Sequence, residues 1–220
     1  MSPADSPTPS DSGWLARTVG IVFDRRTYRH LLYLLLAFPL GLIYYLFVGF
    51  GLTFGLVLSV VVVGVVVLAA TIGLVRLFAE LERRLANVLL STTLGPAEDV
   101  DSTGSGILAT VTRYVDAPST WRGLSFVTMK LWTGIVGLVL IVALISAIQI
   151  ATAPLHYPHR VEFGTLNGEP IAWTIQTLPE AALAVPIGGL LVLVCLHVTN
   201  AVAYVCARIA EALLGSDEHL

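Results

Sequence analysis

The sequence has little charge and almost no lysine. Only 12% of its 220 residues are Asp, Glu, Lys or Arg, and Lys130 is the single lysine. A typical soluble domain carries about twice that charged fraction. With 56% hydrophobic residues and a mean hydropathy of +0.84, the chain cannot cover itself with polar surface in water. The composition therefore excludes an ordinary soluble domain and predicts a protein of the lipid bilayer. The net charge of −3 and the lack of a basic run predict no nucleic-acid partner.

Cysteines and catalytic motifs are also scarce. The two cysteines, Cys195 and Cys206, are 11 positions apart in one apolar run. A helix would separate them by roughly 16 Å, whereas a disulfide needs Cα atoms within about 7 Å, so we interpret both as apolar packing residues. The sequence has no nucleophile motif, Walker loop, zinc-peptidase motif or dinucleotide-binding fingerprint. These absences predict a protein that is not an enzyme and uses no cofactor.

Four apolar stretches are long enough to cross a bilayer, which takes about 20 helical residues. They cover approximately residues 31–50, 54–75, 126–153 and 181–204. The first two are separated only by the Gly-Leu-Thr triplet at 51–53, which predicts a tight helical hairpin with its turn there. The predicted fold class is therefore an all-α membrane protein with four transmembrane helices.

The basic residues predict the orientation of these spans. If the N-terminus lies inside, eleven of the twelve Lys and Arg residues lie on or near the cytoplasmic side, and only Arg160 lies outside. Because cytoplasmic loops carry an excess of Lys and Arg, we predict a multi-pass protein of the cell membrane with both termini in the cytoplasm. Lys130 lies about one turn inside the third span, and we interpret it as a side chain that snorkels to the lipid headgroups.

Two parts of the sequence resemble each other. Thr-Tyr-Arg at 27–29 and Thr-Trp-Arg at 120–122 each precede a span and are 93 positions apart. RRLANVLLS (83–91) follows the second span, and RIAEALLGS (208–216) follows the fourth at an offset of 125. We interpret the chain as a tandem 2+2 repeat, in which each copy has an interfacial amphipathic helix, two spans and an amphipathic tail. Since both copies would begin inside, we expect them to run in the same direction, related by an axis near the membrane normal.

This interpretation divides the chain into five parts. The N-terminal Ser/Pro/Asp-rich segment predicts a disordered cytoplasmic tail, and the Ser/Thr/Gly/acidic segment between the repeats predicts a flexible cytoplasmic linker. The parts are a tail (1–13), a first repeat (14–91), a linker (92–106), a second repeat (107–216) and a short C-terminal tail (217–220).

The polar segment 156–179 predicts a small external β-hairpin. Asn167-Gly168 separates two β-prone runs, RVEFGTL and EPIAWTI, and Asn-Gly is a strong signal for a type I′ turn. We expect Trp173 to face the membrane interface or to cap the helices. This segment is the only sizeable external structure that the sequence predicts, so it is the best candidate for recognition of an external ligand or partner.

Two histidines in this segment raise the question of a metal site. The spacing of His156 and His159, with Glu162 nearby, would suit zinc if the segment were helical. Pro154 and Pro158 oppose a helix, and a third firm ligand is missing. We therefore predict no metal, and we keep His156 and His159 with Asn167 and Trp173 as candidates for external recognition.

Three polar residues lie within the predicted spans. Gln149 is near the outer end of the third span, whereas His197 and Asn200 are about one turn apart in the inner half of the fourth. Polar side chains inside a membrane are costly, and they mark either interhelical hydrogen bonds or function. Packing is the default interpretation, and a proton-responsive His197 is the alternative.

Four segments together resemble the putative sensor domain family, which is common in haloarchaea and actinobacteria. They are TYRHLLYLLLAFPLGLIYY, STWRGLSF, QTLPEA and LHVTNAVAYVCARIAEALLGS. The resemblance covers approximately residues 14–216. It implies a four-helix membrane sensor module, often attached to a sensor histidine kinase. No kinase segment follows Ser216 in this sequence, so we expect a separate histidine kinase or transcription regulator as the partner.

Two functions of different class remain open at this point, with a structural membrane protein that binds no ligand as a third option. The first is a sensor-like or regulatory membrane module that passes a membrane or external signal to a cytoplasmic partner. The alternative is a small transporter or permease component, which would need polar residues along its spans. The run VLSVVVVGVVVLAA at 57–70 is as apolar as lipid, which disfavours transport. Besides the lipid bilayer and the regulatory partner, a second copy of the chain is the remaining candidate partner.

Overall fold

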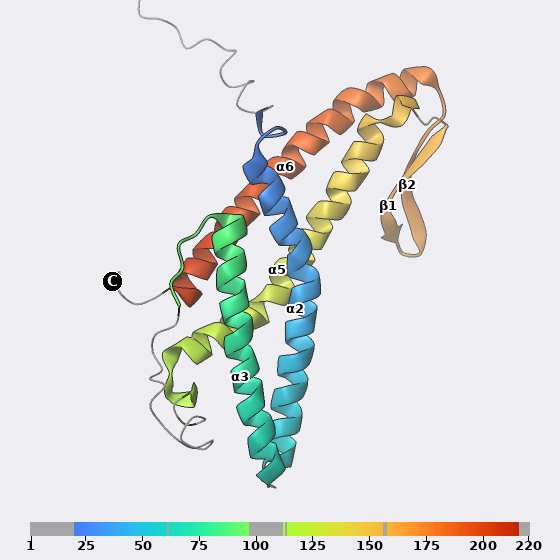
Figure 1. Ribbon diagram of the computed structural model, residues 1–220. Helices are drawn as coiled ribbons and strands as arrows, with labels where there is room; N and C mark the ends of the chain where they lie inside the picture. Colours follow the sequence, from blue (N-terminus) through green and yellow to red (C-terminus); the bar gives the residue numbers. More distant parts are fainter. Residues whose placement is uncertain (1–19, 61, 97–111, 113, 156–157, 216–220) are drawn as a thin grey trace, which may run out of the picture. The chain divides into compact units, whose positions relative to one another are not determined.

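The computed structural model describes residues 20–60, 62–96, 112, 114–155 and 158–215. Four long helices account for most of them (Figure 1). They are α2 (Arg25–Val57), α3 (Val62–Leu85), α5 (Pro118–Ala151) and α6 (Leu178–Leu214). The shorter elements are the 3-10 turns η1 (Leu58–Val60) and η3 (Ala153–Leu155), the π-helical turn η2 (Ala86–Leu90), and strands β1 (His159–Leu166) and β2 (Glu169–Ile175). All four helices are long and apolar enough to cross a membrane, which confirms the predicted fold class.

The chain forms two compact units. We call one of them the hairpin unit; it contains the described residues up to Tyr28 and those from Val142 to Asn200. The other, the crossing unit, contains the described residues from Arg29 to Ile141 and those after Asn200. Several predicted segments fall outside the described residues, namely the N-terminal tail, residues 97–106 of the linker, the first part of each interfacial helix (14–19 and 107–111) and the C-terminal tail (217–220).

The turn between α2 and α3 lies later than the sequence predicts. Residues 51–53 are inside α2, and the turn is formed by η1. Gly51 and Gly55 do not form the turn; they allow α2 and α3 to approach each other closely. A Cβ atom on Gly51 would collide with the Thr71 side chain, and one on Gly55 would lie 2.7 Å from the Leu68 side chain. Small residues at helix contacts have this role in membrane bundles.

Glycines also bring α2 and α5 together in the crossing unit. A Cβ atom on Gly41 would lie 2.7 Å from the Leu131 Cα, and one on Gly134 would lie 2.5 Å from the Phe38 Cα. Backbone therefore meets backbone at this crossing. Position 38 meets 134 and position 41 meets 131, so the two helices run antiparallel where they pack.

This contact describes only the crossing of α2 and α5; the expectation that the two repeats run in the same direction across the membrane is not tested by it and stays a prediction. That expectation came from the arginine distribution, which predicts the side of the membrane that a helix end faces. It carries no information about the helix faces that pack against each other. The packing of α2 against α5 is determined by their glycines, because a residue without a Cβ atom lets the two backbones approach closely.

The two similar triplets make the same local hydrogen bond. The Tyr28 hydroxyl donates to the Val22 carbonyl at 2.7 Å, and the Trp121 indole N–H donates to the Val115 carbonyl at 2.8 Å. In both cases the acceptor lies six residues before the aromatic residue. The similarity in sequence thus corresponds to a similar way of entering α2 and α5.

The predicted β-hairpin is confirmed. β1 and β2 are antiparallel, and the turn residues Asn167 and Gly168 have φ angles of 53° and 86°. Positive φ at both central positions is the mark of a type I′ turn. A bulge between Glu162 and Gly164 interrupts the register.

A small apolar core holds the hairpin to the helices of the hairpin unit. Ile175 at the end of β2 is fully buried, and Trp173 packs against the same cluster. The remaining members come from the end of α5, from η3 and from the start of α6: Ile150, Ala153, Ala181 and Ala184. The start of α6 is fixed by Glu180, whose carboxylate accepts hydrogen bonds from the backbone N–H groups of Gln176 (2.9 Å) and Thr177 (3.2 Å). The Glu180 backbone N–H in turn donates to the Thr177 hydroxyl at 3.5 Å. This reciprocal cap explains the Gln-Thr-Leu-Pro-Glu segment.

Candidate functional site: a buried ion pair

A buried ion pair joins α3 to α5 in the crossing unit. The Lys130 ammonium lies 2.7 Å from a Glu82 carboxylate oxygen. Lys130 is 2% exposed and Glu82 is 0% exposed. Both side chains are therefore buried between apolar helices, where an isolated charge would be strongly disfavoured.

Aromatic side chains of α2 and α5 complete the surroundings of this pair. The Tyr44 hydroxyl donates to the other Glu82 carboxylate oxygen at 3.0 Å. The Lys130 ammonium lies 3.9 Å from the centroid of the Tyr33 ring and 6.0 Å from that of the Phe126 ring. A cation over an aromatic face is stabilised by the ring quadrupole. We call Glu82, Lys130, Tyr33 and Tyr44 the buried ion-pair cluster.

The interpretation of Lys130 as a snorkelling side chain is wrong. It was based on the position of Lys130 about one turn inside the third span, near the cytoplasmic face. In the structure α3 continues to Leu85 and leads directly into η2, and Glu82 lies between the buried Ala79 of α3 and the buried Ala86 of η2. Glu82 therefore occupies the packed face of the helix and supplies the opposite charge.

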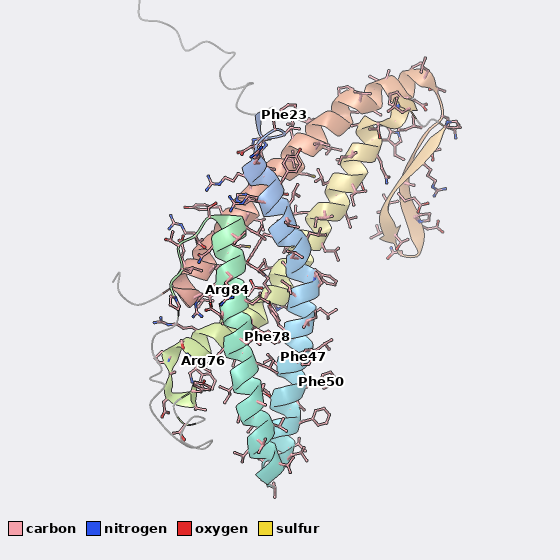
Figure 2. The ribbon with its side chains drawn as sticks, viewed as in Figure 1. Phe23, Phe47, Phe50, Arg76, Phe78 and Arg84 are labelled. Atoms are coloured by element: carbon pink, nitrogen blue, oxygen red, sulfur yellow. The ribbon has the colours of Figure 1, made fainter. Side chains whose placement is uncertain are left out.

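Arginines of α3 make further polar contacts with the ends of other helices. The Arg76 guanidinium donates to the hydroxyls of Ser119 (2.9 Å) and Thr120 (3.0 Å) at the start of α5. The Arg83 guanidinium is buried and donates to the Leu214 carbonyl at the end of α6 (3.1 Å). Arg84, in contrast, is exposed and pairs with Glu80 on its own helix (Figure 2).

The candidate residues within the spans do not form one site. Asn200 is partly buried, and its side-chain amide donates to the hydroxyl of the fully buried Thr27 at 3.0 Å. His197 is exposed, and its Nδ1 lies 2.8 Å from the Leu193 carbonyl of the same helix. Gln149 is also exposed. Within the hairpin unit, Asn200 thus makes an interhelical contact that His197 and Gln149 do not share.

The candidates for external recognition are spread along the β-hairpin. Asn167 forms the turn and Trp173 packs on the apolar core, whereas His159 begins β1 and His156 lies outside the described residues. Within the described part of the chain, no three His, Cys, Asp or Glu side chains lie close enough together to hold a metal ion.

Sequence reasoning missed Glu82, Tyr33 and Tyr44. A signal for Glu82 was present, because Ala79, Glu82 and Ala86 recur at the three- and four-residue spacing of one helix face. Following that face beyond Arg76 would have placed a carboxylate on the packed side of the helix.

The fold and the cluster together define a class of protein. Four helices able to span a membrane, with an ion pair buried between them, form an all-α multi-pass membrane module. The family model described as Putative sensor matches residues 33–214, and the chain belongs to that family. No curated protein and no solved structure matches the chain.

Proposed function

We propose that the protein is a non-enzymatic membrane sensor module that passes a membrane or external signal to a separate cytoplasmic partner. A histidine kinase or a transcription regulator is the proposed partner. Membership of the Putative sensor family and the four apolar helices support a sensor in the membrane. The observation that carries the proposal furthest is the buried Glu82–Lys130 pair.

The ion pair is a poor device for stability alone. Taking two charges out of water is expensive, and replacing a buried pair by apolar residues of similar volume is often neutral or stabilising. Ionisable residues within membrane helices are accordingly functional candidates. Because Glu82 is on α3, Lys130 on α5 and Tyr44 on α2, a displacement of α5 against the other two helices would break this contact. The cluster is therefore suited to report a change in helix packing.

The β-hairpin is the proposed recognition element for an external signal. Its turn depends on Gly168, whose φ of 86° is unfavourable for a β-branched residue. The four helices do not include this turn, so its replacement leaves them intact. Asn167 and Trp173 would contribute to recognition, with the histidines at 156 and 159 as further candidates.

Transcript profiling of the native host tests both proposals. Chromosomal Glu82→Leu with Lys130→Met, which replaces the pair by apolar side chains, is expected to give normal membrane abundance and the transcript profile of a deletion strain. Gly168→Val is also expected to give normal membrane abundance. In the presence of the external signal, its transcript profile is expected to match that of the deletion strain. The matched control is Arg208→Gln with Glu211→Gln, an exposed pair at 3.2 Å, which is expected to resemble the wild type. A wild-type profile from an abundant Glu82→Leu, Lys130→Met protein would contradict the proposed role of the pair.

The proposed orientation places both termini in the cytoplasm and the β-hairpin outside, because of the arginine asymmetry. Single cysteines at Ser59, Ser102 and Thr165, in a background with Cys195 and Cys206 replaced, test it in intact cells. We expect an impermeant maleimide to label positions 59 and 165 but not 102. Labelling at 102, or protection at 165, would contradict the orientation. Labelling at 59 with protection at 165 would place the two helical hairpins on opposite faces of the membrane.

A further inference from the structure

The buried face of α2 recurs in α5. Seven buried positions of the first helix each have a buried counterpart 93 residues later in the second, although the residue types differ in most cases. The pairs are Thr27 and Thr120, His30 and Gly123, Tyr33 and Phe126, Leu34 and Val127, Ala37 and Lys130, Gly41 and Gly134, and Tyr44 and Gly137. Of the other two buried positions of α2, Val48 has the half-buried Ile141 as its counterpart and Gly55 the exposed Ile148. Tandem spans that are merely both apolar would not be expected to share seven of nine buried positions.

The buried face of α3 and the following η2 recurs in the same way in α6. Here the offset is 124, one less than the sequence comparison predicts. The pairs are Val75 and Thr199, Ala79 and Ala203, Glu82 and Cys206, Ala86 and Ala210, and Leu90 and Leu214, and all ten residues are buried. The burial pattern thus extends the repeat from the first helix of each copy to the second.

The contacts between α2 and α5 are reciprocal under the same offset. Gly41 packs on Leu131, and adding 93 to the first position and subtracting 93 from the second gives 134 and 38, the observed pair Gly134 and Phe38. A Cβ atom on Gly137 would lie 2.8 Å from the Leu34 carbonyl oxygen. The same exchange gives positions 44 and 127, and Tyr44 and Val127 share one apolar cluster.

The threonines that open the two helices show the same exchange. The Thr27 hydroxyl of the first repeat accepts a hydrogen bond from Asn200 of the second, at 3.0 Å. The Thr120 hydroxyl of the second repeat accepts one from Arg76 of the first, also at 3.0 Å. Asn200 and Arg76 differ by 124 positions, so they are equivalent in the two repeats.

Reciprocal contacts of this kind, in which i meets j and the equivalent of j meets the equivalent of i, are the signature of a two-fold interface. We infer that the module is a fused pseudo-dimer, in which the buried face of each repeat is a self-complementary surface and its partner is the other repeat. The two-fold axis passes between α2 and α5 near Gly41 and Gly134. The ion pair occupies one of two equivalent positions, and Ala37 and Cys206 occupy the other. This inference does not depend on a sensing function.

Distances between spin labels test the two-fold relation in the full-length protein. The label pair at positions 45 and 128 is equivalent to the pair at 138 and 35, and all four side chains are exposed in the crossing unit. In nanodiscs, and with the native cysteines replaced, double electron–electron resonance is expected to give the same mean distance for both pairs. Mean distances that differ by more than the width of either distribution would overturn the inference.

Moving the ion pair to the equivalent position is a second test. The transposed variant carries Lys130→Ala, Ala37→Lys, Glu82→Cys and Cys206→Glu. We expect it to melt at a higher temperature than Lys130→Ala with Glu82→Cys, which lacks the pair. The matched control places the new carboxylate at the buried Ala210 instead, with Cys206 retained, and is expected to melt at a lower temperature than the transposed variant. A transposed variant that melts no higher than Lys130→Ala with Glu82→Cys would contradict the equivalence of the two positions. If the transposed variant does not fold, the spin-label distances still test the inference.

Discussion

Lys130→Ala is expected to lower the free energy of unfolding by about 3–5 kcal/mol, the usual cost of removing one partner of a buried ion pair. The substitution leaves the fully buried Glu82 carboxylate with the Tyr44 hydroxyl but without the ammonium at 2.7 Å. It also removes the cation from the Tyr33 ring. The measurement is a reversible unfolding titration with a denaturing detergent in mixed micelles.

Two comparisons separate the effect of the pair from that of any lost side chain. Glu82→Leu with Lys130→Met is expected to be much closer to the wild type than Lys130→Ala alone, because no unpaired charge stays buried. Arg208→Ala, at an exposed ion pair with Glu211, is expected to change nothing measurable. If Lys130→Ala and the apolar double variant were equally stable, the Glu82 carboxylate would not be confined to a dry interior.

Gly41→Ala is expected to destabilise the protein by about 1–3 kcal/mol, the usual cost of overpacking. The new methyl group would lie 2.7 Å from the Leu131 Cα and 2.8 Å from its backbone nitrogen, so α2 and α5 would have to separate. Gly49→Ala on the same helix meets nothing within 4 Å and is the matched control. There the gain in helix propensity, up to about 1 kcal/mol, is expected to stabilise the protein.

The opposite signs make this comparison decisive, and the same unfolding titration measures both variants. Gly134→Ala, which would meet the Phe38 backbone, is expected to cost about as much as Gly41→Ala. A stabilising Gly41→Ala would mean that the close crossing of α2 and α5 does not exist in the membrane.

The sequence predicted the four helices and the β-hairpin because each depends on local or compositional signals. Long apolar runs specify helices in lipid, since every backbone polar group there must be satisfied within the segment. The turn at Asn167 and Gly168 needs positive φ at two successive residues, and few residue types other than these adopt it.

The remainder depends on contacts between residues far apart in the chain. Gly51 resembled a turn residue, and only its neighbour Thr71 on α3 shows that it serves helix packing. Lys130 resembled an interfacial lysine, and only Glu82, 48 positions away, shows that it is buried and paired. Hydropathy averages over such single polar residues, so it predicted the helices but missed the ion pair between them.

In the pseudo-dimer that we infer, the Glu82–Lys130 pair is also a consequence of having both repeats in one chain. In a homodimer of one repeat, every interface substitution would appear twice, so an acid and a base could enter the interface only as two pairs related by symmetry. Each pair would carry its own desolvation penalty, of several kcal/mol per ion before the charges attract one another. In the inferred pseudo-dimer, the joining of the two repeats in one chain removes that constraint. One half can evolve the acid and the other the base, while Ala37 and Cys206 keep the equivalent position uncharged.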